Sequence, residues 1–389
     1  MRITFVSNYI NHHQLPLCMA LMEENEVDFT FLQTEPMTEE RKNMGWDESL
    51  SKLSFVKLYY EDTEGSKALI MDSDVVIFGG AEDESLIIPR LEKGKFTIRY
   101  SERIYKEGRY KFVSPRGLIR KYKDHTRFRK SPVYLLCAGA YTAGDFKLVG
   151  AYKNKALEFG YFPKVIEYSD LNELREDNEC VNLLWVSRYI DWKHPYMPVN
   201  LAKRLKKEGK SFHLTMVGRG EMLKEVEEYA KASDLLSVIT FIESKSPDEV
   251  RTLMRKADIF LLTSDMKEGW GAVINEAMNS GCAVVCSHET GAAPSLIKHN
   301  INGKMFISKD EESLYRQVLS LLDDKALRYE LGSKAYKTMT TSWNAKEASK
   351  RLISFIKDDN HEIKKYDDMG PLSPAKNLSF AKVKKGIRN

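Results

Sequence analysis

Short apolar runs that suit buried strands alternate with helical stretches through the first half of the chain. Strands separated by helices predict a parallel sheet with right-handed crossover connections. The helices expected in this half are Pro16–Glu24 and Ser85–Leu91. The expected strands are Ile3–Val6, Asp28–Leu32, Ser54–Leu58, Asp74–Phe78, Lys95–Arg99 and Tyr134–Cys137.

The pattern changes near Gly160, and residues 166–180 are polar and acidic, as expected of a domain linker. A second alternation of strands and helices then begins. Its expected strands are Val181–Val186, Phe212–Val217, Val238–Ile242, Ile259–Thr263 and Ala283–Ser287. Its expected helices are Pro198–Glu208, Met222–Ala232, Asp248–Lys256, Ala272–Asn279, Glu311–Leu322, Lys325–Thr338 and Asn344–Lys357.

The two alternations predict an α/β protein with two facing doubly wound, Rossmann-like domains and a cleft between them. We place the first domain at residues 1–165 and the second at 166–342. Ligands of such sheets bind outside the carboxyl ends of the strands, so both strand-end regions are candidate sites. Residues 361–389 are polar and basic, and we expect this tail to be loosely ordered or draped on the surface.

Composition agrees with an ordinary globular chain of 389 residues, 42% hydrophobic and 30% charged, with a formal net charge of +4. No segment approaches the roughly 18 apolar residues of a membrane span, and the N-terminus suits a buried strand better than a signal peptide. The five cysteines are scattered and odd in number. We therefore expect a cytoplasmic protein with neither disulfides nor a structural zinc.

The strongest candidate site follows the strand Ile259–Thr263. Gly269 and Gly271 allow a ligand to approach the backbone, and a helix that opens near Gly271 directs N–H groups at phosphate oxygens. Glu268 precedes this helix and Glu276 lies within it, so both can accept hydrogen bonds from hydroxyl groups. An isolated pair of glutamates at this spacing is more often solvated surface. The flanking strands and glycines favour a site for a ligand that is half phosphate and half polyol.

Two further loops follow strands of the second domain. Arg188 and Lys193 come after Val181–Val186, where a guanidinium and an ammonium can bind phosphate, although such a pair alone is more often surface charge. Gly218, Arg219 and Gly220 form a G-x-G that lacks the third glycine of a dinucleotide site and is weak evidence by itself.

Together these segments resemble the nucleotide-sugar-binding half of retaining glycosyltransferases of the GT-B fold, the glycosyltransferase family 4-like, glycosyl transferases group 1 enzymes. The resemblance covers residues 181–300 well and the remainder by architecture only. Ser187 stands where a glycine is common, Lys193-His194 where lysine-glycine is usual, and Glu268-Gly-Trp-Gly where Glu-Gly-Phe-Gly is frequent. Trp343 and residues 343–360 resemble the helix that crosses back to the first domain in this fold.

The resemblance implies a role for each matching residue. Arg188 and Lys193 would hold the diphosphate, and Glu268 would contact the hydroxyls of the donor sugar; these three are the predicted catalytic residues. Glu276 would bind the ribose. The remaining donor-binding residues would be Gly218 and Arg219 near the nucleotide, with Gly269, Trp270, Gly271 and Ala272 against sugar and phosphate.

The implied reaction transfers a sugar from a UDP- or GDP-sugar to a hydroxyl of a glycan or lipid-linked acceptor, with retention at the anomeric carbon. The departing phosphate would assist deprotonation of the acceptor. No cofactor and no metal would be required. Surface polysaccharide synthesis of the bacterial type is the expected setting. The alternatives are a nucleotide-sugar epimerase of the same fold, which needs no acceptor, and a non-catalytic nucleotide-sugar-binding module.

The acceptor side offers weaker signals. Asn11, His12, His13 and Gln14 follow the first strand and are candidate acceptor ligands, although helix capping by Asn11 and one packed histidine explain them equally well. Residues 101–130 hold eleven Lys or Arg against three Asp or Glu, interleaved with aromatics. This segment suits an anionic membrane surface, which a peripheral enzyme with a lipid-linked acceptor would use. A nucleic-acid site would look similar, but no nucleic-acid partner is expected, and a solvated charged segment is the remaining alternative.

Overall fold

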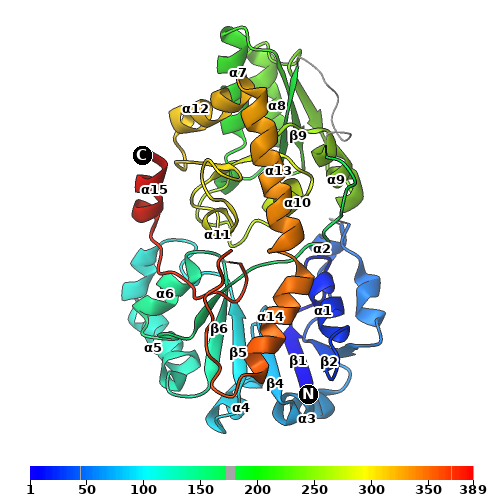
Figure 1. Cartoon of the computed structure of the whole chain (residues 1–389), viewed down its shortest axis with the longest axis vertical. Coiled ribbons are helices and arrows are strands. Elements are labelled where there is room, and N and C mark those ends of the chain that lie inside the picture. Colours follow the sequence, from blue (N-terminus) through cyan, green and yellow to red (C-terminus); the bar gives the residue numbers. More distant parts are fainter. Residues whose placement is uncertain (44, 172–179, 369, 389) are drawn as a thin grey trace. The chain divides into compact units, whose positions relative to one another are not determined.

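The computed structural model describes residues 1–43, 45–171, 180–368 and 370–388. The chain divides into two compact units (Figure 1). The first contains residues 1–164 and 342–379, and the second contains 165–341 and 380–389. Of the predicted linker at 166–180, residues 172–179 lie outside the described residues.

The first unit is built on one parallel sheet in the order β3-β2-β1-β4-β5-β6-β7. Every strand predicted for this half is present, and β7 is additional. Its strands are β1 (Arg2–Ser7), β2 (Asp28–Gln33), β3 (Val56–Leu58), β4 (Val75–Phe78), β5 (Thr97–Ser101), β6 (Val133–Ala138) and β7 (Ala156–Phe159). Its α-helices are α1 (Leu15–Met22), α2 (Glu39–Asn43), α3 (Thr63–Asp72), α4 (Ile88–Glu92), α5 (Pro115–Asp124), α6 (Thr142–Leu148) and α14 (Ala345–Lys357).

The helix α14 belongs to the first unit although it follows the second in sequence. Asn344 caps it by accepting a hydrogen bond from the Glu347 amide at 2.9 Å. The buried face of α14 packs against α1. Ser349 also donates to the Glu24 carboxylate, 3.4 Å away, beyond the end of α1.

The tail is more ordered than predicted. Leu372 is buried, and Pro374 forms an antiparallel bridge with Leu157 of β7. The Glu158 amide donates to the Ser373 carbonyl at 2.7 Å. The physical reason is that β7 is an edge strand whose N–H and C=O groups need partners, which the returning chain supplies. The last helix, α15 (Phe380–Arg388), contacts the second unit instead.

The second unit is built on a six-stranded parallel sheet in the order β10-β9-β8-β11-β12-β13. All its predicted strands are present, while β13 and the short α11 were not anticipated. Its strands are β8 (Val181–Val186), β9 (Phe212–Val217), β10 (Ile239–Ile242), β11 (Ile259–Leu262), β12 (Ala283–Ser287) and β13 (Lys304–Phe306). Its other helices are α7 (Tyr196–Lys207), α8 (Leu223–Ala232), α9 (Pro247–Lys256), α10 (Val273–Asn279), α11 (Ala293–Leu296), α12 (Glu311–Leu322) and α13 (Lys325–Thr341).

Both units are therefore doubly wound α/β domains, as predicted. In the second, β8 and β11 are adjacent and parallel, with Leu183 beside Ile259. The loops that leave the carboxyl ends of these two strands must start side by side. This neighbourhood brings together the predicted site residues of the two loops.

Candidate functional site

A buried threonine joins the two central strands of the second domain to the loop that carries Lys193. The Trp185 indole N–H of β8 donates to the Thr263 hydroxyl at 2.9 Å. That hydroxyl in turn donates to the backbone carbonyl of Lys193 at 2.6 Å. Because Trp185 and Thr263 are fully buried, this chain of hydrogen bonds fixes the Lys193 backbone at the end of the sheet.

Lys193 and Glu268 form an ion pair between the loop after β8 and the loop after β11. Their side chains are only 11% and 15% exposed. The Lys193 ammonium also lies 4.3 Å from the centre of the Trp192 ring, within the range of a cation–π contact. The structure thus brings two of the predicted catalytic residues into direct contact although they are far apart in sequence.

Asp265 connects its own loop to the loops that carry His194 and Lys309. Its carboxylate accepts from His194 and Lys309, each 3.2 Å away, and from the Lys267 amide at 3.0 Å. Burial alone would raise the pKa of Asp265, but these donors outweigh it and lower the pKa to about 2. Sequence reasoning missed Asp265, although an aspartate directly after a buried strand is a signal for a strand-end site.

His194 takes the left-handed conformation, with φ of +50°. This conformation explains why a glycine is common at this position in the family that the sequence resembles. The strain of a side chain in this region is offset here by the hydrogen bond from the imidazole to Asp265.

The glycine loop after β11 is braced by the loop after β12. The Gly291 amide donates to the Glu268 carbonyl at 3.3 Å, and the Ala292 amide donates to the Trp270 carbonyl at 2.9 Å. A Cβ on Gly291 would lie 1.7 Å from the Gly269 carbonyl oxygen. Gly271, with φ of +92°, also needs to be glycine. Gly291 was not predicted, because nothing in the sequence indicates which loop it contacts.

Two predicted donor-binding residues, Trp270 and Glu276, have side-chain partners within the second domain. Trp270 is buried, and its indole N–H donates to the Asn275 amide oxygen at 2.9 Å, so only its backbone can contribute to an open site. Glu276 pairs with Arg251 at 3.7 Å. Burial raises the pKa of Glu276 to about 6, against the opposing effect of the Arg251 charge.

Gly218 and Gly220 allow the loop after β9 to approach the loop after β8. A Cβ on Gly218 would lie 1.9 Å from the Ser187 carbonyl oxygen, and the Tyr189 amide donates to the Arg219 carbonyl at 2.8 Å. These glycines therefore have a packing reason that the G-x-G pattern did not reveal. Arg188, in the adjoining loop, is exposed, with its guanidinium 5.7 Å from the Trp192 ring.

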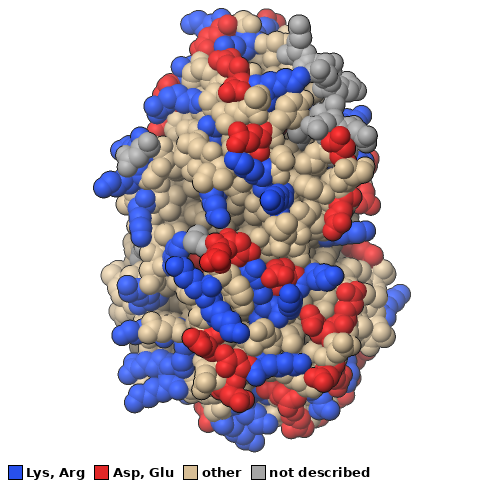
Figure 2. All heavy atoms as spheres, viewed as in Figure 1, with Lys and Arg blue, Asp and Glu red and all other residues tan. Residues whose placement is uncertain are grey.

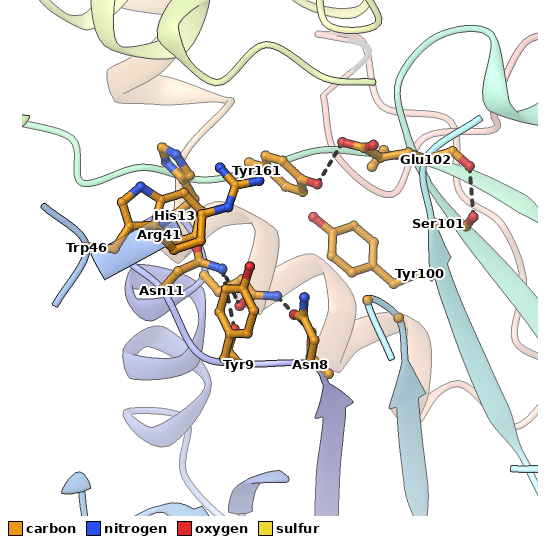
Figure 3. A pocket seen from close by; sticks show the side chains of 15 residues that line it. Asn8, Tyr9, Asn11, His13, Arg41, Trp46, Tyr100, Ser101, Glu102 and Tyr161 are labelled. Carbon is orange, nitrogen blue, oxygen red and sulfur yellow. Dashed lines mark hydrogen bonds between the residues drawn. The ribbon is translucent and has the colours of Figure 1, made fainter. Parts of the chain in front are cut away.

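A second candidate site lies in the first domain, where a pocket of about 310 Å³ opens at the carboxyl ends of the strands (Figure 3). Asn11, His13 and Gln14 of the predicted set line this pocket. His12 is not among the lining residues and packs edge-on against Trp46, 5.1 Å between ring centres. The lining residues that the sequence did not single out include Tyr9, Arg41, Trp46, Tyr100, Glu102 and Tyr161.

Hydrogen bonds position two of the amide side chains that line this pocket. Asn11 donates its side-chain amide to the Gln14 carbonyl oxygen at 2.9 Å, and the Gln14 amide donates to the Ser7 hydroxyl at 3.2 Å. Gln14 is the residue just before α1, and its side chain makes no capping hydrogen bond to the helix. Neither of these two hydrogen bonds is therefore a helix cap. The amide groups of both residues are thus held at the pocket surface.

The basic segment at residues 101–130 is partly interior and partly exposed. Arg103 is buried and pairs with Asp145 at 3.2 Å, and Tyr105 and Phe128 are also buried. Between them, however, large apolar side chains face solvent on and before α5. Their exposed fractions are 70% for Tyr110, 73% for Val113, 57% for Ile119 and 56% for Tyr122.

Basic side chains surround these apolar residues. Arg116, Arg120 and Lys123 of α5 are exposed, and acidic residues are few on this part of the first domain, near the α5 and α6 labels of Figure 1 (Figure 2).

Among the described residues no helix is long and apolar enough to cross a membrane. The described residues also include no group of three or more His, Cys, Asp or Glu side chains arranged to bind a metal ion.

Residues 170–338, which contain the loops around Lys193 and Glu268, match the family model of glycosyl transferases group 1. This part of the chain is similar to a glycosyl transferases group 1 domain. Amylovoran biosynthesis glycosyltransferase AmsK of Erwinia amylovora is 27% identical over 185 residues, which are 46% of this chain and 45% of AmsK. The chain therefore spans less than half the length of that relative.

Solved structures resemble nearly the whole chain. HepE of Anabaena, in complex with UDP, matches with a TM-score of 0.67 and 13% identity over 91% of this chain and 99% of HepE. A glycosyltransferase from Rickettsia africae matches with a TM-score of 0.67 and 14% identity over 92% of this chain and 98% of the other. At these identities the likeness concerns the fold, and it confirms the predicted class of two Rossmann-like domains of the GT-B type. The residues that match the glycosyl transferases group 1 model lie in the second of the two.

Proposed function

We propose that this protein is a retaining glycosyltransferase that moves a sugar from a nucleotide-sugar to a hydroxyl of a glycan or lipid-linked acceptor in surface polysaccharide synthesis. The observation that carries the proposal is the Lys193–Glu268 pair, which lies within the residues that match the glycosyl transferases group 1 model. The polysaccharide setting is supported by AmsK, a glycosyltransferase of amylovoran biosynthesis. A UDP donor is supported by HepE, whose structure contains UDP.

Lys193 and Arg188 bind the diphosphate of the donor in this proposal. When the bond between the anomeric carbon and the phosphate oxygen breaks, negative charge grows on the departing nucleoside diphosphate. Fixed cations stabilise that charge more in the transition state than in the bound donor. Loss of one such contact costs about 3 kcal/mol, or roughly a hundredfold in rate.

Glu268 and Glu276 bind hydroxyl groups of the donor. In the structure Glu268 accepts from Lys193, and its carboxylate has further lone pairs for the hydroxyls of the sugar. Glu276, with its pKa raised to about 6, is mostly ionised at neutral pH and accepts hydrogen bonds from the ribose. Gly269, Gly271 and Ala272 let the backbone approach sugar and phosphate.

Retention follows if the acceptor hydroxyl attacks from the face that the diphosphate leaves. The bond from the acceptor oxygen to the anomeric carbon then forms on that face, and the departing phosphate oxygen takes the acceptor proton. We expect no obligatory metal, because Arg188 and Lys193 supply the positive charge. Transfer measured with and without EDTA tests this expectation, and an NMR spectrum of the product gives its anomeric configuration.

A panel of UDP-, GDP- and ADP-sugars tests the proposed function. The full chain is incubated with each donor, and thermal shift and nucleotide release are followed. We expect at least one donor to stabilise the protein and to be consumed when an acceptor is present. An epimerase would change the sugar without an acceptor, and a binding module would give the thermal shift without turnover. If no donor binds, the proposal is wrong.

We also propose that the exposed part of the basic segment, residues 110–124, docks this enzyme on an anionic membrane, where a lipid-linked acceptor would reside. Four large side chains that face solvent can enter the headgroup region, while the cations of α5 attract anionic lipids. Cosedimentation with vesicles of phosphatidylglycerol and phosphatidylcholine tests this. We expect binding that falls with salt and with Ile119→Asp.

Ile301→Asp is the matched control for that experiment, because Ile301 is 52% exposed and lies in the other domain. It should bind vesicles as the unchanged protein does. Equal binding by Ile119→Asp and the unchanged protein would contradict membrane docking through this segment, as would binding to RNA with none to vesicles.

A further inference from the structure

The pocket of the first domain has the size of a site for one small molecule. Its volume of about 310 Å³ lies at the lower end of the ~300–1,000 Å³ typical of ligand pockets. It opens where β1, β4 and β5 end, and Gly79, Gly80 and Ser101 are among the residues that line it. The strand-end position is the one at which doubly wound sheets bind ligands.

The walls of this pocket combine aromatic faces with amide groups. Tyr9, Trp46 and Tyr161 line it together with Asn8, Asn11 and Gln14 (Figure 3). Aromatic rings offer flat apolar surface, and amides both donate and accept hydrogen bonds. A sugar has the matching chemistry, because the C–H groups of its ring suit an aromatic face and its hydroxyls suit amides.

The pocket is also electrically asymmetric. Arg41 lines one side, with its guanidinium 4.7 Å from the centre of the Trp46 ring. Glu102 lines the other side, where it accepts from the Tyr161 hydroxyl at 2.7 Å and pairs with Lys106. Figure 3 shows the Arg41 side chain directed toward Tyr161, across the pocket. Because Glu102 pairs with Lys106, its negative charge is balanced within the chain.

We propose that this pocket binds the sugar of the acceptor and that this sugar carries an oxyanion, a carboxylate or a phosphate, held by Arg41. The guanidinium is a planar fork that binds such oxyanions with two hydrogen bonds, and its stacking on Trp46 orients the fork. The hydroxyls of the sugar face Asn11, Gln14 and the remaining lone pairs of Glu102. The inference rests on the proposed function and specifies its acceptor.

Ligand-observed NMR on the full chain tests the inference with four probes: glucuronate, glucose 6-phosphate, glucose and inorganic phosphate. We expect one or both anionic sugars to bind at least about tenfold more tightly than glucose. Glucuronate and glucose 6-phosphate distinguish a carboxylate from a phosphate ester. Inorganic phosphate shows how much of the affinity comes from the anion alone.

Variants locate the binding. Arg41→Gln should remove the preference for anionic sugars, and Arg41→Lys should recover only part of it because the ammonium cannot bind in a fork. Lys93→Gln, at an exposed cation outside the pocket, is the matched control and should leave all four affinities unchanged. Thermal shift of the same samples with the donor reports on the other domain.

Equal affinity for glucose and for both anionic sugars, or an unchanged preference in Arg41→Gln, would overturn the inference. Absence of binding by every sugar probe would overturn it too. In each case an intact thermal shift with the nucleotide-sugar would leave the proposed function standing. Loss of that shift would count against the function itself.

Discussion

The Lys193 ammonium and the Glu268 carboxylate are paired across two loops that leave neighbouring strands, with both side chains mostly buried. Removing one partner leaves the other buried without its counter-charge. We expect Lys193→Met and Glu268→Gln each to lower the free energy of unfolding by about 1–3 kcal/mol, and the double variant to lose less than the sum. Denaturant unfolding measures this coupling.

Lys334 and Glu330 supply the control pair. They are paired at 2.5 Å on α13, with side chains 48% and 55% exposed. Lys334→Met, Glu330→Gln and their double variant should each change the free energy of unfolding by less than about 0.5 kcal/mol. Additive losses in the Lys193–Glu268 cycle would show that the pair is not coupled.

Asp265 makes stability dependent on pH. Its pKa in the folded protein is about 2, below its ordinary value of 3.8, so the ionised carboxylate stabilises the fold above pH 3.8. This contribution is lost as pH falls toward 2. We expect Asp265→Asn to cost on the order of 2 kcal/mol at pH 7 and much less at pH 2.5. A cost that is the same at both pH values, measured by denaturant unfolding, would contradict this account.

Glu276 should show the opposite trend. Burial raises its pKa to about 6 from an ordinary 4.5, so the folded protein keeps a proton that the unfolded chain loses. Stability from this group is therefore present below pH 4.5 and falls as pH rises through 6. Between pH 4 and pH 7, the free energy of unfolding of Glu276→Gln should rise by on the order of 2 kcal/mol relative to that of the unchanged protein. If the difference in unfolding free energy between the two proteins stays constant across this range, the Glu276 carboxyl is not buried as described.

Gly291 should tolerate no side chain, because a Cβ would overlap the Gly269 carbonyl at 1.7 Å. Gly291→Ala must displace the glycine loop, and we expect a loss of about 1–3 kcal/mol in stability together with weaker donor binding. Gly386→Ala is the control, since nothing lies within 4 Å of its Cβ position. Thermal unfolding and donor titration of both variants measure these effects. Equal stability and equal donor affinity in Gly291→Ala and Gly386→Ala would contradict the bracing role of Gly291.

The sequence predicted the two sheets well because their strands are short apolar runs separated by amphipathic helices. It missed β7 and β13 for a physical reason. Ala156–Phe159 and Lys304–Phe306 are short strands at the sheet edges, and partly polar, so their periodicity is weak. The tail residues that pair with β7 were expected to be loose, because nothing local predicts a bridge between Leu157 and Pro374.

The candidate site was predictable as far as it depends on strand ends. Lys193 and Glu268 were singled out because each follows a recognisable strand, and the structure pairs them. Asp265 and Gly291 were not singled out, since they act through contacts with segments distant in sequence. The inward direction of Trp270, toward Asn275, likewise depends on packing that periodicity cannot specify.

The rate of nucleoside diphosphate release from the best donor, with acceptor present, tests the central claim most directly. It is measured for the unchanged protein, Lys193→Met, Glu268→Gln and the Lys334→Met control at a temperature where all four are folded. We predict that the first two variants lose at least about tenfold, consistent with the ~3 kcal/mol expected of one transition-state contact, while the control is unchanged. Near-normal rates in both Lys193→Met and Glu268→Gln would contradict the assignment of the donor site to this pair.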